Sequence, residues 1–177
     1  MSEKAFMFDS EDPAMQQAYR SARSSFRYFW RELSWEHRRI VPGLDMAMVK
    51  FPFTDGPRSD GNAEYEQMWI GDVDFDGDEI SGSLMNSPNW LTSVRQGASI
   101  SMPFQSLSDW MMTSSGRAYG GFSVNLMRSR MNSRERAQHD EAWGLDFGDP
   151  ADVLVEIQRN AKPKAGFVSG LFGRNSR

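Results

Sequence analysis

The sequence of 177 residues contains no cysteine. Disulfide frameworks, cysteine-ligated zinc or iron–sulfur sites and cysteine nucleophiles are therefore excluded. No run approaches the roughly 20 apolar residues that a membrane-spanning helix needs. The first residues, MSEKAFMFDSEDP, also lack the apolar core of a signal peptide. We therefore expect a cytoplasmic protein without a membrane span.

Short catalytic motifs are scarce as well. The sequence has no G-x-S-x-G elbow, no G-x-x-x-x-G-K phosphate loop and no dinucleotide fingerprint. The two histidines, His37 and His139, lie in predicted helices among charged residues, a setting typical of solvated side chains. We predict no catalytic residue, metal site or cofactor, although scattered residues can still assemble an active site.

The composition is that of one soluble domain, with 39% hydrophobic and 25% charged residues. The net charge of −4 is mild, but its distribution is uneven. Between Asp55 and Glu79, nine acidic residues accompany one basic residue, Arg58, whereas residues 159–177 carry five basic residues and no acidic one. Such asymmetry indicates interaction surfaces, although solubility alone also accounts for it.

The first predicted element is an amphipathic helix. After a flexible lead over residues 1–11, Asp12 and Pro13 provide an N-cap and a first helical residue. Apolar residues then recur at three- and four-residue spacing from Met15 to Leu33, which predicts a stripe that packs on the rest of the fold. The polar flank is either a solvated face or a surface for an anionic partner, and it carries Arg20, Arg23, Arg27 and Arg31.

A β-hairpin over residues 64–88 is the strongest short-range signal. Two arms with period-two alternation flank the acidic turn DFDGDE at residues 74–79. The alternation places Trp69, Gly71 and Val73 on one side of the first arm. We predict a preceding strand over residues 45–53 and a following strand over residues 98–104, which contains Pro103 and therefore lies at an edge or near a strand end.

The second half of the chain is predicted to be mainly helical. Asn132 and Glu135 form a capping-box pair, and Asp149-Pro150 repeats the cap-plus-proline start of the first helix. We expect a short helix over residues 106–112, a short strand over 117–122, and helices over 124–131, 134–143 and 151–159.

Most neighbouring strands are joined by turns too short for parallel crossovers. The predicted fold class is therefore α+β, with a small curved antiparallel sheet of about four to five strands packed against the N-terminal amphipathic helix, and with C-terminal helices. We expect the helices on one face of the sheet. The domain spans residues 12–145, and residues 146–177 form a short helix and a flexible basic tail.

The acidic turn partly matches a calcium loop. Asp72, Asp74, Asp76 and Gly77 fit the first half of an EF-hand, but the twelfth position is Ser83 rather than glutamate, and the flanks read as strands. We interpret the turn either as a solvated hairpin tip or as a surface that docks into a basic cleft of a partner. Clustered carboxylates repel one another and gain from nearby cations.

Most of the six tryptophans are expected in the core. Trp90 and Trp110 adjoin predicted loops, so we expect both to be partly exposed, and exposed tryptophan beside a charged surface is typical of binding hot spots. The candidate partner-binding residues are Asp72, Asp74, Asp76, Asp78, Glu79, Trp90 and Trp110.

Several short motifs occur in a fixed order along the chain: MWIGDV from Met68, GSLMNSP from Gly82, ISMPF from Ile100, SDWM from Ser108 and GGF from Gly120. In this order they resemble the YegJ-like bacterial family, a domain of unknown function with family number 2314, over residues 12–131. The resemblance implies a compact α+β fold in a cytoplasmic bacterial protein. It brings no established catalytic residues.

Three functions are compatible with the sequence. The first is a non-catalytic protein-binding domain, an immunity- or antitoxin-like protein that occludes the cationic cleft of a partner toxin or enzyme. The second is a small ligand-binding domain or enzyme with a pocket between the sheet and the first helix. The third is a nucleic-acid-binding accessory protein that uses the arginine flank and the basic tail. The negative net charge and the lack of aromatic residues among these arginines favour a protein partner over nucleic acid.

Overall fold

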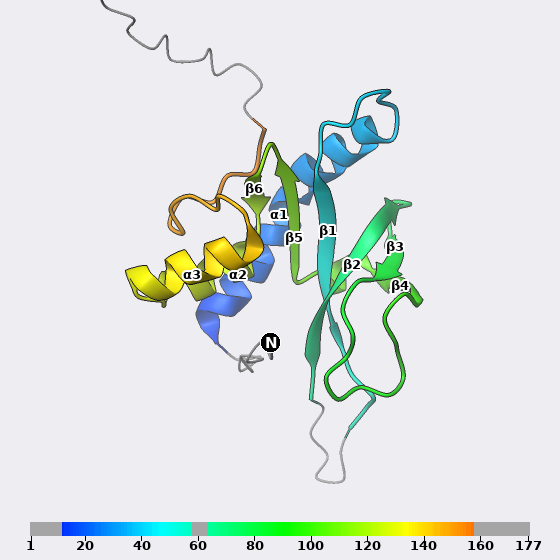
Figure 1. The fold of residues 1–177 in the computed structure, drawn as a ribbon. Coiled ribbons are helices and arrows are strands. Elements are labelled where there is room, and N and C mark those ends of the chain that lie inside the picture. Colours follow the sequence, from blue (N-terminus) through cyan, green and yellow to red (C-terminus); the bar gives the residue numbers. More distant parts are fainter. Residues whose placement is uncertain (1–11, 58–63, 158–177) are drawn as a thin grey trace, which may run out of the picture.

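The computed structural model describes residues 12–57 and 64–157 (Figure 1). The expectations for the lead at residues 1–11 and for the end of the tail lie outside these residues. The elements follow in the order α1 (Pro13–Glu36), β1 (Met46–Phe53), β2 (Glu66–Phe75), β3 (Glu79–Leu84), β4 (Ser99–Pro103), the short 3-10 helix η1 (Phe104–Ser106), β5 (Asp109–Ser114), β6 (Arg117–Gly120), α2 (Phe122–Ser129) and α3 (Ser133–Trp143).

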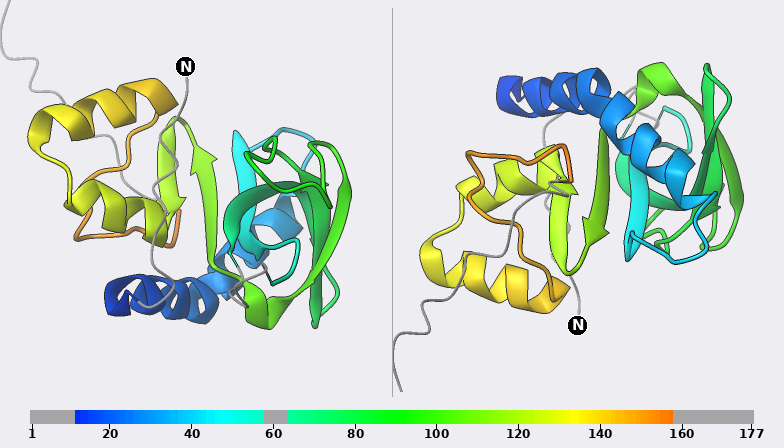
Figure 2. Two further views of the ribbon diagram at one scale, coloured as in Figure 1. Left: turned by 90° about the horizontal axis from the view of Figure 1, so that it is seen from below. Right: turned by 90° about the horizontal axis from the view of Figure 1, so that it is seen from above.

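The strands form one antiparallel sheet of six strands in the order β4-β3-β2-β1-β5-β6. The sheet is curved and open, and β1 to β4 curl strongly when viewed along the strands (Figure 2). The predicted α+β class is thus confirmed, with one strand more than the largest predicted number.

Helix α1 begins as the sequence predicts. Asp12 is the N-cap, and its Oδ1 accepts the backbone N–H of Ala14 at 2.9 Å ahead of Pro13. The apolar stripe is buried against one face of the sheet, where Phe26 and Phe29 meet Trp110 and the rest of the main core. Burial of this stripe, rather than helix propensity, is the main source of the helix's stability.

The opposite face of the sheet is covered as well. Met48, Trp69 and Met111 alternate with the residues that face α1, and they pack against Val124 of α2 and Phe147. The expectation that all helices lie on one face is therefore wrong. Strands β1 and β5 lie between two apolar layers, which explains why their side chains are buried on both sides.

Residues 106–112 were expected to be helical, and this prediction is wrong. The segment instead contains the end of η1 and most of β5. The first five residues of β5 are buried, so the strand lacks the polar–apolar alternation that identifies a half-buried strand in a sequence. Residues of α1 cover one face of β5, and Val124 and Phe147 cover the other, which removes the signal on which strand prediction depends.

The helix predicted over residues 151–159 is absent from its described part, residues 151–157. The Asp149 side chain does accept the N–H of Ala151, but only a turn follows. The chain then runs over the outer edge of β6, where the carbonyl of Leu154 accepts the N–H of Gly120 at 2.7 Å. Leu154, Val155 and Ile157 pack against the main core, and this contact outweighs a weak local preference for helix.

The β2–β3 hairpin forms as predicted, with one irregularity. The pairing register shifts between Gly71 and Asp74, and Asp72 adopts a φ of 51°. This β-bulge adds one residue to β2 and turns Val73 toward the main core, away from the face of Trp69. The bulge also leaves the Asp72 side chain exposed.

Candidate partner-binding surface

The β2–β3 hairpin ends in five exposed acidic side chains, here called the acidic tip: Asp72, Asp74, Asp76, Asp78 and Glu79. Asp76 shapes the turn, because its Oδ1 accepts the N–H groups of Asp78 at 2.9 Å and Glu79 at 2.8 Å. The hydrogen bond from the N–H of Glu79 has the larger effect and that from Asp78 the smaller, and together they hold the pKa of Asp76 below its ordinary value. Gly77 completes the turn with a φ of 115°, which residues with a Cβ rarely adopt.

The negative charge of the acidic tip is not compensated by any described cation. None of its carboxylates forms an ion pair with another residue in the described ranges. Glu79 instead accepts the hydroxyl of Ser101 at 2.6 Å, and Asp74 accepts the N–H of Phe75. The tip is therefore an exposed anionic surface on a hydrogen-bonded turn.

The acidic tip differs from an EF-hand in its surroundings. Both flanking elements are strands, whereas a calcium loop of that kind joins two helices. Asp76 also uses Oδ1 to hold the turn. Among the described residues, no group of three or more acidic or histidine side chains is arranged to hold a metal ion.

A groove of about 240 Å³ lies between the C-terminal end of α1, the start of β1 and β2. We call it the α1 groove. It is lined by Leu33, Glu36, His37, Leu44, Asp45, Met46, Ala47, Asp72 and Val73. It lies where a ligand pocket was expected, but its volume is below the roughly 300–1,000 Å³ of small-molecule sites. The C-terminal end of α1 lies at the same end of the molecule as the turn between β2 and β3 (Figure 1).

Exposed apolar residues lie at the end of α1 and in the loop that follows it. Ile40 is 99% exposed and Val41 is 75% exposed, and both lie in the loop that joins α1 to β1. Trp35, in the last turn of α1, is 42% exposed. Single exposed apolar residues are common, whereas three of them within seven positions make this segment a candidate interaction patch.

Trp90 is exposed as expected, with 38% of its surface accessible. It lies in the loop between β3 and β4, which two carboxylates hold in place. Glu66 accepts the backbone N–H of Asn89 at 2.9 Å. Asp55 accepts the backbone N–H groups of Thr92 at 2.7 Å and Ser93 at 3.1 Å, together with both hydroxyls. The hydroxyl of Ser93 and the groups of Thr92 hold the pKa of Asp55 far below its ordinary value.

Trp110 is buried, so the expectation that it is partly exposed is wrong. It lies on β5 beneath α1, and its Nε1 donates to the carbonyl of Ala22 at 3.0 Å. Its ring contacts Phe29 and Phe122, with centroids 5.6 and 5.8 Å away. Trp110 is a core residue and cannot anchor a partner.

The arginine flank of α1 is only partly available to a partner. Arg23 donates to the carbonyl of Leu107 at 2.8 Å and ties α1 to the start of β5, and Arg31 lies near Glu32 and Glu156. Arg20 donates to Gln17, whereas Arg27 is exposed and lies over the ring of Tyr28.

The expected lack of aromatic residues on this flank is wrong. Tyr28 lies within 5.5 Å of the Arg31 guanidinium as well, and Trp35 lies 5.8 Å from it. These contacts are cation–π pairs between side chains of α1 itself. The flank therefore offers fewer than four unengaged guanidiniums to a phosphate backbone.

A buried polar cluster on the opposite face of the sheet gave no recognised signal in the sequence. Lys50 of β1 donates to the hydroxyl of Ser123 at 2.8 Å, and that hydroxyl donates to Asp109 of β5 at 2.6 Å. The Lys50 amine also lies 4.4 Å from the centre of the Trp69 ring. Burial lowers the pKa of Lys50 and raises that of Asp109, and each charge opposes the shift of the other.

Asp109 also caps helix α2. Its oxygens accept the N–H groups of Phe122 at 3.0 Å and Ser123 at 2.7 Å, the first residues of the helix. The carboxylate is fully buried, and a carboxylate at a helix N-terminus interacts favourably with the unpaired N–H groups there. These contacts fix α2 on the sheet, which gives the cluster a structural role.

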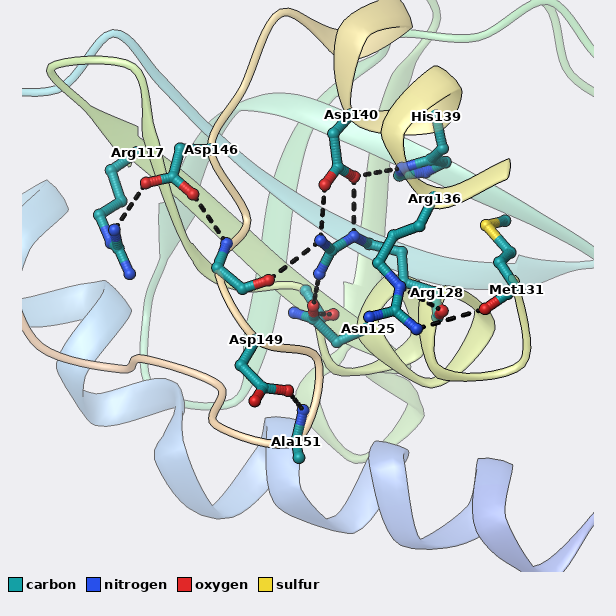
Figure 3. Close-up of polar contacts among 12 residues, drawn as sticks. Arg117, Asn125, Arg128, Met131, Arg136, His139, Asp140, Asp146, Asp149 and Ala151 are labelled. Atoms are coloured by element: carbon teal, nitrogen blue, oxygen red, sulfur yellow. Dashed lines mark hydrogen bonds and ion pairs between the residues drawn. The ribbon is translucent and has the colours of Figure 1, made fainter. Parts of the chain in front are cut away.

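An ion pair between a buried arginine and a half-buried aspartate joins α2 to α3 (Figure 3). Arg128 is 1% exposed and forms two hydrogen bonds with Asp140, at 2.8 and 2.6 Å. It also donates to Asn125 at 2.6 Å and to the carbonyl of Gly148 at 3.1 Å. Burial alone would raise the pKa of Asp140, but hydrogen bonds from Arg128 and His139 hold it below the ordinary value.

The family described as "Uncharacterized protein conserved in bacteria (DUF2314)" matches residues 12–147. The chain belongs to the DUF2314 family. The resemblance drawn from the ordered motifs is thereby confirmed. No solved structure matches the chain, and no helix among the described residues is both long and apolar enough to cross a bilayer.

Two bacterial relatives are similar to this DUF2314 chain. A putative ankyrin repeat protein of Neisseria meningitidis serogroup B, NMB1133/NMB1171, is 46% identical over 160 residues, which are 90% of this chain and 62% of that protein. The uncharacterized protein YegJ of Escherichia coli is 31% identical over 81 residues, 46% of this chain and 49% of that protein. The chain thus spans about half to three fifths of the lengths of these relatives.

The motifs of the DUF2314 resemblance have structural reasons in this fold. A Cβ at Gly120 would overlap the backbone and ring of Trp110, and Gly120 has a φ of 73°. A Cβ at Gly82 would overlap the carbonyl of Gly71 across the hairpin. The SDWM motif supplies Asp109 and Trp110, so these motifs hold α1, the sheet and α2 together. Trp90 and, apart from Asp72, the acidic tip lie outside these motifs.

Proposed function

We propose that this DUF2314 chain is a cytoplasmic, non-catalytic protein-binding domain of the immunity or antitoxin type. It binds a partner toxin or enzyme and occludes a cationic cleft with the acidic tip. The observation that carries the proposal is the set of exposed tip carboxylates without an ion pair among the described residues. Asp72 of the tip also lines the α1 groove, and Ile40 and Val41 are exposed in the loop after α1.

The two parts of this surface have different tasks. The acidic tip steers a positively charged partner during association, an effect that weakens as salt concentration rises. Ile40 and Val41 supply apolar area that is removed from water in the complex, and the α1 groove accepts a side chain of the partner. The name of the Neisseria relative, a putative ankyrin repeat protein, agrees with a role in protein binding, because ankyrin repeats form extended binding surfaces.

The test begins with co-purification of the chain with the products of neighbouring genes. With a captured partner, the association rate is measured for Asp74→Lys/Asp78→Lys, which reverses two tip charges and leaves Asp76 to hold the turn. We expect the rate to fall about tenfold at low salt and to depend less on ionic strength.

The matched control is Glu141→Lys/Asp152→Lys. It changes the net charge equally at two exposed positions away from the tip. The proposal fails if the tip variant and the control associate at the same rate, or if the captured partner is a nucleic acid whose binding is lost on substitution of Arg20 and Arg27.

A further inference from the structure

Strand β4 forms an edge of the sheet with unpaired backbone groups. Among the described strands it pairs only with β3. Two hydrogen bonds at the ends of this pairing show which residues bond across it: the N–H of Leu84 donates to the carbonyl of Ala98, and the N–H of Phe104 donates to the carbonyl of Asp78. In an antiparallel pair, alternate residues bond to the neighbour. The N–H and C=O groups of Ser99 and Ser101 therefore point away from β3, and no described residue bonds to them.

A groove of about 410 Å³ lies beside this edge. It is lined by Pro52, Phe53, Thr54, Ser93, Val94, Ser99, Ile100, Ser101 and Met102. The sheet curls so far that β4 and the end of β1 line one groove, although two strands, β3 and β2, lie between them in the sheet. Phe53, Val94, Ile100 and Met102 supply its apolar lining, and each packs at the margin of the main core.

We propose that the β4 edge binds an extended segment of a protein partner as an added strand. The partner's backbone bonds to Ser99 and Ser101, and every second side chain enters the groove. Addition of a strand to a sheet edge derives affinity from main-chain hydrogen bonds and specificity from alternate side chains, which agrees with an open edge beside an apolar groove. The partner segment therefore alternates apolar and polar residues.

Strand β4 itself carries no basic residue, so a second copy of β4 would bring no cation to the acidic end of this edge. The charge at the edge gives a further property of the occupant. Asp78 and Glu79 are exposed beside Pro103, the end of β4, and neither has a cationic partner among the described residues. We therefore expect a lysine or arginine at the matching end of the partner segment.

This inference does not rest on an immunity-type function, and its test leaves the acidic tip intact. The full chain is used to select binders from a displayed library of random 12-residue peptides. Enriched peptides are synthesised, their affinities are measured by calorimetry, and their positions are mapped by amide chemical shifts. We expect alternating apolar residues with a basic residue at one end, and perturbation at Ser99, Ser101 and Val94.

Two substitutions at one position separate strand addition from simple apolar contact. Ser101→Pro removes the outward N–H without removing a bond to β3, and it should weaken peptide binding at least tenfold. Ser101→Val keeps that N–H and should bind within about twofold of the original chain. Val94→Glu, which puts a charge into the groove, should also weaken binding. Circular dichroism and thermal unfolding verify that each variant is folded.

Three results would overturn the proposal. The library yields no enriched peptide; or selected peptides bind Ser101→Pro and Ser101→Val equally well; or the chain alone forms a dimer that Ser101→Pro dissociates, in which case the occupant is a second copy.

Discussion

Lys50 and Asp109 are direct partners across β1 and β5, and Ser123 joins the amine of one to the carboxylate of the other. Both charged side chains are at least nine-tenths buried. A buried ion pair adds little net stability, but removal of one member leaves the other charge buried and uncompensated.

We therefore predict that Lys50→Met destabilises the fold by about 3–5 kcal/mol. The double variant Lys50→Met/Asp109→Asn should recover part of this loss, since no unpaired charge remains and Asn can still accept hydrogen bonds at the start of α2. Urea unfolding of the two variants measures the difference. Equal stability of the single and double variants would contradict the buried-charge explanation.

Trp90 and Trp110 should respond very differently to truncation. Trp110→Ala removes a buried ring that contacts Phe29 and Phe122, and we expect a loss of about 3–5 kcal/mol. Trp90→Ala removes a partly exposed side chain, and we expect a loss below about 1 kcal/mol. Thermal unfolding of both variants tests the assignment of Trp110 to the core, which a small effect at that position would refute.

Asp140 should make stability depend on pH. Its pKa in the folded protein lies below the ordinary value of 3.8, so its contribution is complete above that pH and is lost as the pH falls through the folded value. Asp140→Asn should destabilise the protein by about 3 kcal/mol at pH 7, because Arg128 loses its paired charge, and should flatten the loss of stability below pH 4. Glu156→Gln is the control, since the Arg31–Glu156 pair is exposed and contributes less than about 1 kcal/mol.

The loop that carries Trp90 should loosen when Asp55 is replaced. In Asp55→Ala, the amides of Thr92 and Ser93 lose their acceptor, and we expect their hydrogen exchange to accelerate at least tenfold while exchange in β1 and β5 stays unchanged. In the original chain the lowered pKa of Asp55 keeps its carboxylate ionised at pH 3.8, so the contact persists there and is lost only as the pH falls through the lower folded value. Exchange at Thr92 that does not respond to the substitution would show that other contacts hold the loop.

The local elements could be predicted because their signals are local. Asp12 and Pro13 mark the start of α1, Asn132 and Glu135 form the capping box of α3, and the alternation around the Asp-Gly turn specifies the hairpin. The order of these elements with short connections was sufficient to give the α+β class.

The errors concern features that depend on distant parts of the chain. Trp110 adjoins a loop in the sequence, but α1 covers it from a position 88 residues away. Lys50 and Ser123 are 73 residues apart, so no spacing rule connects them. Strand β5 resembled a helix because both of its faces are buried, and residues 151–157 depend on the edge of β6 for their path.

The two edges of the sheet have unequal capacity for assembly. Along β6, the carbonyls of Asp146 and Leu154 accept the N–H groups of Ala118 and Gly120, so that edge already has a neighbour within the same chain. Endless strand-by-strand polymerisation requires two open edges on every molecule. A described chain with only β4 open can join one further strand and no more, so association through this sheet stops at a finite complex rather than a fibre.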